Sequence, residues 1–219
     1  NHMINSVNNL ISIQETLVKR IKNFKQVNVI AVSKTFPIEN VMPLIKHGHE
    51  HYGENKVQEA IEKWHNIKLD FKNIKLHMIG KLQTNKVKQA VQIFDYIHSL
   101  DNLKLAEKID NEQSKINKKI KIFIQVNIGN EIQKSGISIE NLKNFYLTCK
   151  TDLNLNIVGL MCLPPQNNSS IKYFTKMKKL LDDIDEKELS MGMSADFTEA
   201  AEHGSTFLRI GSSIFGQRS

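Results

Sequence analysis

The sequence predicts a closed (β/α)8 barrel, in which eight parallel strands alternate with helices around one axis. Eight short apolar runs alternate with helical patterns along the 219 residues, without internal repeats or low-complexity tracts. Such alternation is typical of a parallel sheet, and eight units favour closure of that sheet into a barrel. Barrels of this type begin at about 200 residues, so the length agrees with a single α/β domain.

The elements follow in order along the chain. A leading helix is expected over about 4–23, because apolar residues recur there near the 3.6-residue period. Strands are expected near 28–34, 49–53, 75–80, 95–100, 120–128, 155–163, 189–194 and 206–211. Helices are expected near 38–47, 54–66, 83–93, 102–116, 138–150, 169–185 and 195–203. Little chain follows Gly216, so the leading helix should fill the last place in the outer ring.

Lys34 is the first candidate functional residue, because it ends the apolar run of the first predicted strand. Parallel barrels place their chemistry at the carboxyl ends of the strands. Partial burial there lowers the pKa of a lysine and frees its lone pair for attack on an aldehyde. A lysine at a strand end is more often simply solvated, so this position alone is a weak signal.

Two strand ends late in the chain are suited to bind a phosphate group. Ser194 ends the seventh predicted strand and is the predicted N-cap of the helix over 195–203, and the eighth strand runs into Gly211 and Ser212. Backbone N–H groups and helix dipoles at such ends attract anions. The phosphate sites of (β/α)8 barrels are often found after strands seven and eight.

Further polar and apolar residues fall at the same end of the predicted barrel. Asn55 follows the second strand and could hydrogen-bond a ring substituent, while Glu54 is a possible proton acceptor. Helix capping is an equally good explanation for these two residues. Met191 is expected in the core or in the pocket wall, because methionine commonly fills irregular gaps.

Eight motifs in this order resemble the pyridoxal phosphate homeostasis proteins, the family of YggS and PROSC. They are Ala31 to Thr35, Gly53 to Asn55, His77 to Lys86, Gln125 to Ile128, Lys134 to Gly136, Gly159 to Met161, Leu189 to Asp196 and Arg209 to Gly216. The resemblance implies one barrel, over 3–219, like the N-terminal domain of alanine racemase (fold type III of the pyridoxal phosphate enzymes). It also implies pyridoxal 5'-phosphate (PLP) held as an internal aldimine on Lys34, a role in vitamin B6 homeostasis, and no substantial catalytic turnover.

The charge pattern singles out Arg209. The formal net charge is +7, yet only three of the 30 basic residues are arginines. An arginine inside a predicted strand suggests a need for its planar fork, and with PLP implied it is expected to face the pyridine nitrogen. An arginine paired with a barrel carboxylate is the alternative. The lysines are scattered and aromatic residues make up only 7% of the chain, which argues against a dedicated nucleic-acid site.

Other classes of site have weaker support. Cys149 and Cys162 suit a reducing compartment. No carboxylate or cysteine nearby completes a four-ligand set with His47, His49 and His51, so no metal is expected. No apolar stretch approaches the ~20 residues of a membrane span and no signal peptide is recognisable, which predicts a cytoplasmic protein. Residues 1–2, before Met3, read as a cloning remnant.

Three function classes remain open from the sequence. The first is a PLP carrier that exchanges or protects its cofactor, with PLP-dependent apoenzymes as possible recipients. The second is a PLP-dependent amino-acid racemase, although the resemblance offers no segment for the second domain that supplies an opposing acid/base tyrosine in racemases. The third is a phosphate-ligand barrel of isomerase type that uses Lys34.

Overall fold

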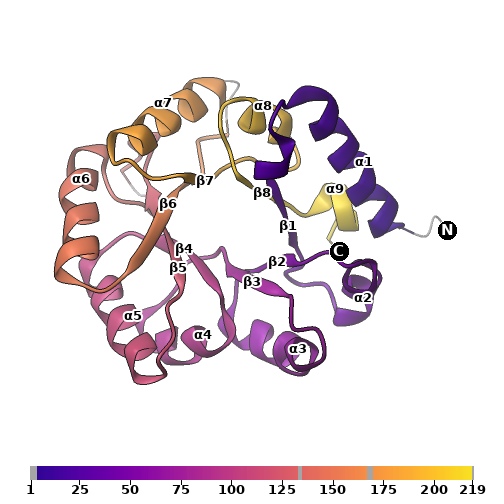
Figure 1. Cartoon of the computed structure of the whole chain (residues 1–219), viewed down its shortest axis with the longest axis horizontal. Coiled ribbons are helices and arrows are strands. Elements are labelled where there is room, and N and C mark those ends of the chain that lie inside the picture. Colours follow the sequence, from indigo (N-terminus) through magenta and orange to yellow (C-terminus); the bar gives the residue numbers. More distant parts are fainter. Residues whose placement is uncertain (1–3, 133–134, 167–169, 219) are drawn as a thin grey trace.

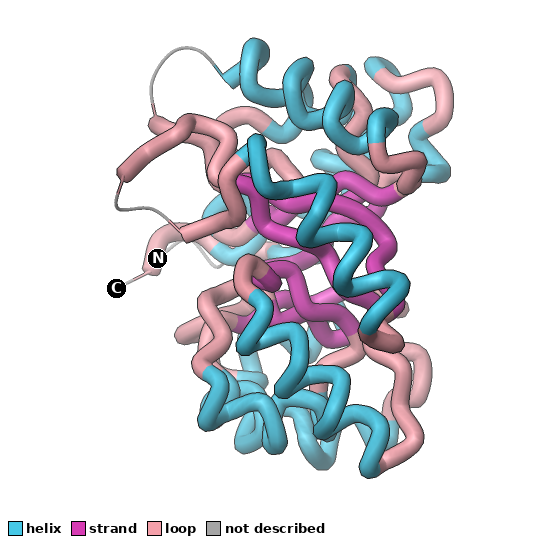
Figure 2. Tube along the Cα trace, turned by 90° about the vertical axis from the view of Figure 1, so that its left-hand side faces the viewer, coloured by secondary structure: helices cyan, strands magenta, loops and turns pink. Residues whose placement is uncertain are grey.

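The chain forms a closed barrel of eight parallel strands, which confirms the predicted fold class. The computed structural model describes residues 4–132, 135–166 and 170–218. The strands follow one another around the barrel in chain order, and the last pairs with the first through Ile30 and Arg209 (Figure 1). Helices surround the strands on the outside, as the side view also shows (Figure 2).

The strands and helices lie close to the predicted positions. The strands are β1 Asn28–Val32, β2 His51–Glu54, β3 Lys75–Met78, β4 Tyr96–Leu100, β5 Lys121–Val126, β6 Asn156–Cys162, β7 Glu188–Ser190 and β8 Phe207–Ile210. The helices are α1 Ser6–Arg20, α2 Ile38–His47, α3 Val57–Asp70, α4 Val87–Ile93, α5 Leu103–Lys115, α6 Ile139–Leu147, α7 Ser170–Asp183, α8 Phe197–Glu202 and α9 Ser212–Phe215. Short 3-10 turns occupy Phe24–Gln26 and Thr84–Lys86, and a π turn spans Thr148–Asp152.

Helix α1 takes the last place in the outer ring, as predicted. Its N-cap is Asn5, whose side chain accepts a hydrogen bond from Asn8 N, and its buried face includes Leu10 and Leu17. The helix packs between α8 and α2 and against α9 (Figure 1). The short helix α9 was not predicted.

Strands β1, β3, β5 and β7 end two or more residues earlier than predicted, and beyond β1 and β7 the backbone turns away from the sheet. Strand β1 ends at Val32, and Thr35 soon afterwards has a left-handed φ of 68°. Strand β7 ends at Ser190, and Gly192 has a φ of 100°. Left-handed backbone interrupts the pleat, so the residues beyond these points belong to loops.

The strands separate two buried cores. The larger core lies between the strands and the surrounding helices. The barrel interior contains the smaller one, formed by Ile30, Tyr96, Phe123, Met161 and Phe207. Because successive strand residues face opposite sides, inward and outward residues alternate along each strand. Among the described helices, none is both long and apolar enough to cross a membrane.

Candidate functional site

A cavity of about 360 Å³ lies at the carboxyl ends of the strands. This volume falls within the range of sites for small organic ligands. Residues of β1, β5 and β8 form its wall, together with residues that follow every strand except β4. The wall comprises Val32, Lys34, Asn55, Ile79, Gly80, Lys81, Gln125, Val126, Asn127, Ser135, Leu163, Met193, Arg209, Gly211 and Arg218.

Lys34 lines this cavity and is the candidate nucleophile. Its side chain is half-buried, and burial lowers the pKa of the amine. The positive charge of Arg218 lowers that pKa further, while Glu54 acts weakly in the opposite direction. A lowered pKa increases the fraction of neutral amine, which is the form that attacks a carbonyl.

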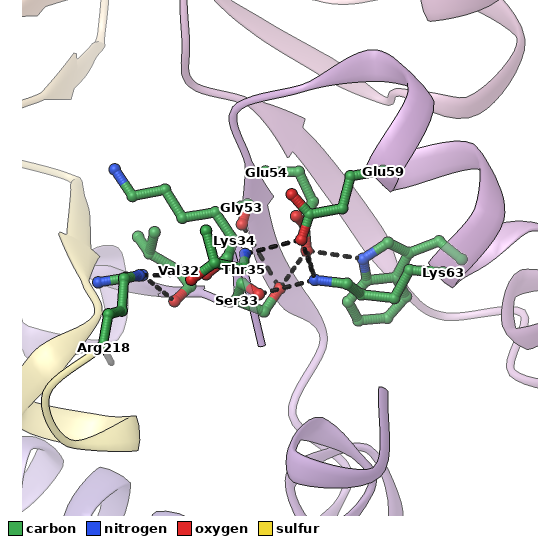
Figure 3. A network of polar contacts seen from close by, with 10 residues as sticks. Val32, Ser33, Lys34, Thr35, Gly53, Glu54, Glu59, Lys63 and Arg218 are labelled. Atoms are coloured by element: carbon green, nitrogen blue, oxygen red, sulfur yellow. Dashed lines mark hydrogen bonds and ion pairs between the residues drawn. The ribbon is translucent and has the colours of Figure 1, made fainter. Parts of the chain in front are cut away.

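Backbone contacts on both sides hold the Lys34 segment in place (Figure 3). The backbone N–H of Thr35 donates to Glu59 Oε2 at 2.7 Å, which supports its left-handed conformation. On the other side, Arg218 donates from Nε to Lys34 O and from Nη2 to Val32 O, both at 3.1 Å. The guanidinium of Arg218 therefore fixes the carboxyl end of β1 at the cavity wall.

Glu54 does not have the role that the sequence suggested. Its side chain is fully buried and lies outside the cavity wall, where its Oε2 accepts from Ser33 Oγ at 2.5 Å and from Lys63 Nζ and Trp64 Nε1 at 3.0 Å. It is neither a proton acceptor at the cavity nor a helix cap, because α3 has Lys56 as its N-cap. The reason is the pleat of β2, which turns Gly53 inward and Glu54 outward. Figure 3 shows the Lys34 side chain pointing away from this network.

We expect Lys63→Met to destabilise the protein by about 3 kcal/mol or more, because it leaves the buried carboxyl of Glu54 without its cation. The side chains of Lys63 and Glu54 are 7% and 0% exposed, and Lys63 Nζ also donates to Ser33 O at 2.7 Å. The matched control is Lys178→Met, which removes a pair with Asp182 whose side chains are 47% and 60% exposed. Surface pairs contribute at most about 1 kcal/mol. Equal shifts in the urea midpoint for the two variants would contradict this account of the network.

The Arg209 side chain points from β8 into the barrel interior and lines the cavity from that side. It is 4% exposed and donates from Nη1 to Ser190 Oγ at 2.5 Å and from Nη2 to Cys162 O at 2.8 Å. Within the described residues it forms no ion pair with a carboxylate, so the alternative of a barrel salt bridge is wrong. A guanidinium has five N–H donors, and these two contacts leave others for a ligand.

The other predicted site residues lie at different distances from the cavity. Asn55 and Gly211 line it with Lys34 and Arg209, whereas Met191 is fully buried in the outer core and Met193 takes the place in the wall. The left-handed backbone at Gly192 separates these two methionines, so they do not share one face as residues i and i+2 of a strand would.

Ser194 and Ser212 lie beside the cavity wall rather than in it. The Ser194 hydroxyl accepts from Ser213 N at 3.1 Å and thereby joins the loop after β7 to the start of α9. Ser194 is not the N-cap of α8, because that helix begins at Phe197 with Asp196 as its N-cap. The two predicted strand ends therefore meet, as a shared anion site requires.

The remaining motif, the two cysteines and the possible metal ligands were also singled out in the sequence. Ser135 lines the cavity, whereas Lys134 and residues 1–3 lie outside the described residues, as do residues 167–169. Burial raises the pKa of both Cys149 and Cys162 to about 12, so neither is a reactive thiolate. In the described part of the chain, no three histidine, cysteine or carboxylate side chains are grouped as metal ligands.

Sequence reasoning missed Arg218 and Lys81, which both line the cavity. The signal that singled out Arg209 applied to Arg218 as well, because arginine is rare in this chain. Lys81 offered no comparable signal among so many lysines.

The comparisons with known proteins agree with this architecture. Residues 9–219 match the family described as alanine racemase, N-terminal domain. The pyridoxal phosphate homeostasis protein of Aquifex aeolicus is 39% identical over 200 residues, covering 87% of this chain and 86% of that protein. The protein of the same name from Pasteurella multocida is 34% identical and covers 96% of both chains.

Solved structures show the same relationship. PipY of Synechococcus elongatus, solved with PLP bound, has a TM-score of 0.86 and 30% identity, covering 97% of this chain and 100% of PipY. An alanine racemase of Clostridium difficile has a TM-score of 0.74 at 14% identity, which is a likeness of fold alone, and this chain spans 57% of it. The chain therefore belongs to the alanine racemase N-terminal domain family and, within it, to the pyridoxal phosphate homeostasis proteins.

Proposed function

We propose that this protein binds PLP covalently through Lys34 and acts in intracellular PLP homeostasis. The observation that carries the proposal is the position of Lys34, an amine of lowered pKa in the wall of a cavity that also presents Arg209 and Asn55. PLP supplies an aldehyde, and a neutral lysine amine condenses with an aldehyde to a Schiff base with loss of water. The PLP-bound relative PipY supports the choice of ligand.

The chemistry of the cavity fits the functional groups of PLP. Arg209 can donate to a ring nitrogen but cannot supply a proton to it, because a guanidinium remains protonated. Asn55 offers an amide to a ring substituent. Ser194, Gly211 and Ser212, where the loop after β7 meets α9, are proposed to bind the phosphate.

A carrier role fits the cavity better than a racemase role. Of the described residues that line the cavity, none is a tyrosine, histidine, cysteine, aspartate or glutamate, so Lys34 and the exposed Lys81 are the acid/base side chains of the described wall. We propose that the protein releases PLP to PLP-dependent apoenzymes in the cytoplasm. The names of its relatives support this assignment.

Absorbance spectroscopy of the purified protein tests the proposal. Addition of PLP should produce a visible absorbance band distinct from that of free PLP, and borohydride should bleach it, because borohydride reduces a Schiff base to a stable secondary amine. A protein that shows no new band at millimolar PLP does not have the proposed function.

The phosphate assignment predicts that Ser194→Ala combined with Ser212→Ala weakens PLP binding ten-fold or more. Hydrogen bonds to a charged group contribute on the order of 1.5–3 kcal/mol each, and 1.4 kcal/mol is a factor of ten. Fluorescence titration with PLP measures the effect, with Ser213→Ala as the control because that exposed neighbour contributes its backbone N–H rather than its hydroxyl. If the double variant binds PLP as tightly as the wild type, the anion lies elsewhere.

The composition of the cavity wall predicts no amino-acid racemase turnover above that of free PLP. Proton return to the opposite face of a substrate requires a second positioned acid. The second lysine of the described wall, Lys81, is exposed, and no hydrogen bond or ion pair to the described residues positions it. Deuterium exchange at the Cα of alanine, followed by NMR, is the measurement. Exchange at enzyme-like rates that depends on Lys34 would favour the racemase alternative.

A further inference from the structure

A continuous chain of hydrogen bonds runs through the barrel interior from Arg209 to the opposite end of the barrel. Arg209 Nη1 is 2.5 Å from Ser190 Oγ, which is 2.9 Å from His98 Nδ1. His98 Nε2 is 2.9 Å from His77 Nδ1, and His77 Nε2 is 2.9 Å from His51 Nδ1. We call Ser190, His98, His77 and His51 the histidine relay.

The relay connects the two ends of the molecule. Arg209 lines the PLP cavity at the carboxyl ends of the strands. His51 is the first residue of β2 and lines a second cavity, of about 500 Å³, at the amino ends of β1 and β2.

Arg209 fixes the direction of every hydrogen bond in the relay. A guanidinium only donates, so Ser190 Oγ accepts from it. Ser190 is fully buried, and among the described residues His98 Nδ1 is the acceptor within reach of its hydroxyl, so the hydroxyl donates to His98. A neutral His98 that accepts at Nδ1 carries its proton on Nε2 and donates to His77 Nδ1. By the same logic His77 donates to His51, so His98 and His77 are both held as the Nε2–H tautomer.

The surroundings keep the imidazoles neutral and their rings in place. His77 stacks on Tyr96 with centroids 4.1 Å apart, and His98 stacks on Phe123 at 4.3 Å. Both histidines are fully buried, which lowers the pKa of each well below its usual value, and the charge of Arg209 lowers the pKa of His98 further. A neutral ring is required here, because each ring must accept at Nδ1.

We propose that the histidine relay positions Arg209 for the PLP ring, with Ser190, His98, His77 and His51 as positioning residues. This inference rests on the proposed function. Ser190 Oγ and Cys162 O hold two guanidinium nitrogens, so Arg209 enters the cavity in one orientation. Because the Ser190 hydroxyl donates to His98, its oxygen becomes a stronger acceptor for Arg209, and each further donation along the relay adds to this effect.

The relay cannot deliver protons to PLP, because its end at the cavity is a guanidinium that does not exchange its charge at neutral pH. The relay affects the orientation of Arg209 and, through Arg209, the electron density of the PLP ring. The expected consequence of breaking it is a changed spectrum and faster loss of PLP, with the covalent link to Lys34 retained.

Ser190→Ala tests the proposal, because it removes one hydroxyl from the junction of Arg209 and His98 and adds no bulk. We expect the absorbance maximum of bound PLP and its pH dependence to shift, and PLP to dissociate about ten-fold faster, as for loss of one hydrogen bond to a charged group. Ser190→Thr, which restores the hydroxyl, should restore both. Ser205→Ala is the matched control, because the buried Ser205 hydroxyl contacts the carbonyls of Leu189, Met191 and Phe207 outside the relay.

Nitrogen-15 NMR of the histidine rings gives a second readout that needs no PLP. In the PLP-free wild type, His98 and His77 should each show a protonated Nε2 and an unprotonated Nδ1, and Ser190→Ala should convert His98 to a tautomer mixture. A fixed tautomer that survives Ser190→Ala, or spectral shifts of equal size in Ser205→Ala, would overturn the inference. A wild type that shows the predicted tautomers but takes up no PLP would contradict the proposed function and leave the direction of the relay established.

Discussion

Lys34→Ala should abolish covalent PLP binding, with no visible absorbance band and no borohydride-trapped label, while the protein remains folded. The amine is the only group at this position that can condense with the aldehyde, and its side chain lies at a cavity wall rather than in either core. The expected loss of labelling is complete, whereas circular dichroism and the melting temperature should change little. Phosphate contacts could retain some PLP noncovalently, which dialysis would remove.

Lys81→Ala is the matched control for this experiment, because Lys81 is another lysine in the same cavity wall. It is exposed, and no contact comparable to those of the Lys34 segment fixes it among the described residues. The Lys81 variant should keep the absorbance band. Equal labelling of wild type and Lys34→Ala would move the Schiff base to another lysine and refute the assignment.

The second large effect is a steep loss of stability as the pH falls below 6.5. Burial lowers the pKa of His49 and His51 to about 4 and that of His77 and His98 well below the usual value of 6.5. Between these values the unfolded chain binds more protons than the folded chain, so the free energy of unfolding decreases as the pH decreases. Each histidine that stays neutral contributes about 1.4 kcal/mol per pH unit.

The resulting loss is a large part of the stability of a typical protein. His49 and His51, with a pKa of about 4, together give about 3 kcal/mol between pH 6.5 and 5, against a total of about 5–15 kcal/mol, and the fully buried His77 and His98 act in the same direction. Burial raises the pKa of Glu54 and of Glu188, so these two groups act in the opposite direction above pH 4.5. The four histidines outnumber these two glutamates, so the free energy of unfolding still decreases as the pH decreases.

Urea unfolding at pH 7, 6 and 5 measures this slope. The slope gives the number of protons taken up on unfolding, and His77→Gln should reduce that number by about one, whatever its effect on stability at pH 7. A free energy of unfolding that stays constant from pH 7 to 5 would show that the buried histidines are not held neutral.

The fold and the central lysine could be predicted from the sequence, because both depend on local patterns. Alternating strand and helix patterns identify the barrel, and an apolar run that ends in an amine, together with the family resemblance, makes Lys34 the candidate. The strand ends were less accurate, because the left-handed conformations of Thr35 and Gly192 end β1 and β7 early. For the same reason Met193, and not Met191, lines the cavity.

The histidine relay could not be predicted, because it depends on register across strands. His51, His77 and His98 lie on β2, β3 and β4, and nothing in the sequence of one of these strands relates its histidine to the next. Ser190 is 92 positions from His98 and meets it only because the barrel closes. The orientation of Glu54 depended on the pleat of β2, which a shift of one residue reverses.

Mass spectrometry of the borohydride-reduced, proteolysed complex tests the central claim most directly. The account predicts one phosphopyridoxyl adduct, on the peptide that contains Lys34, at one equivalent per chain. An adduct spread over many lysines, or located at Lys81 with Lys34 unmodified, would contradict it.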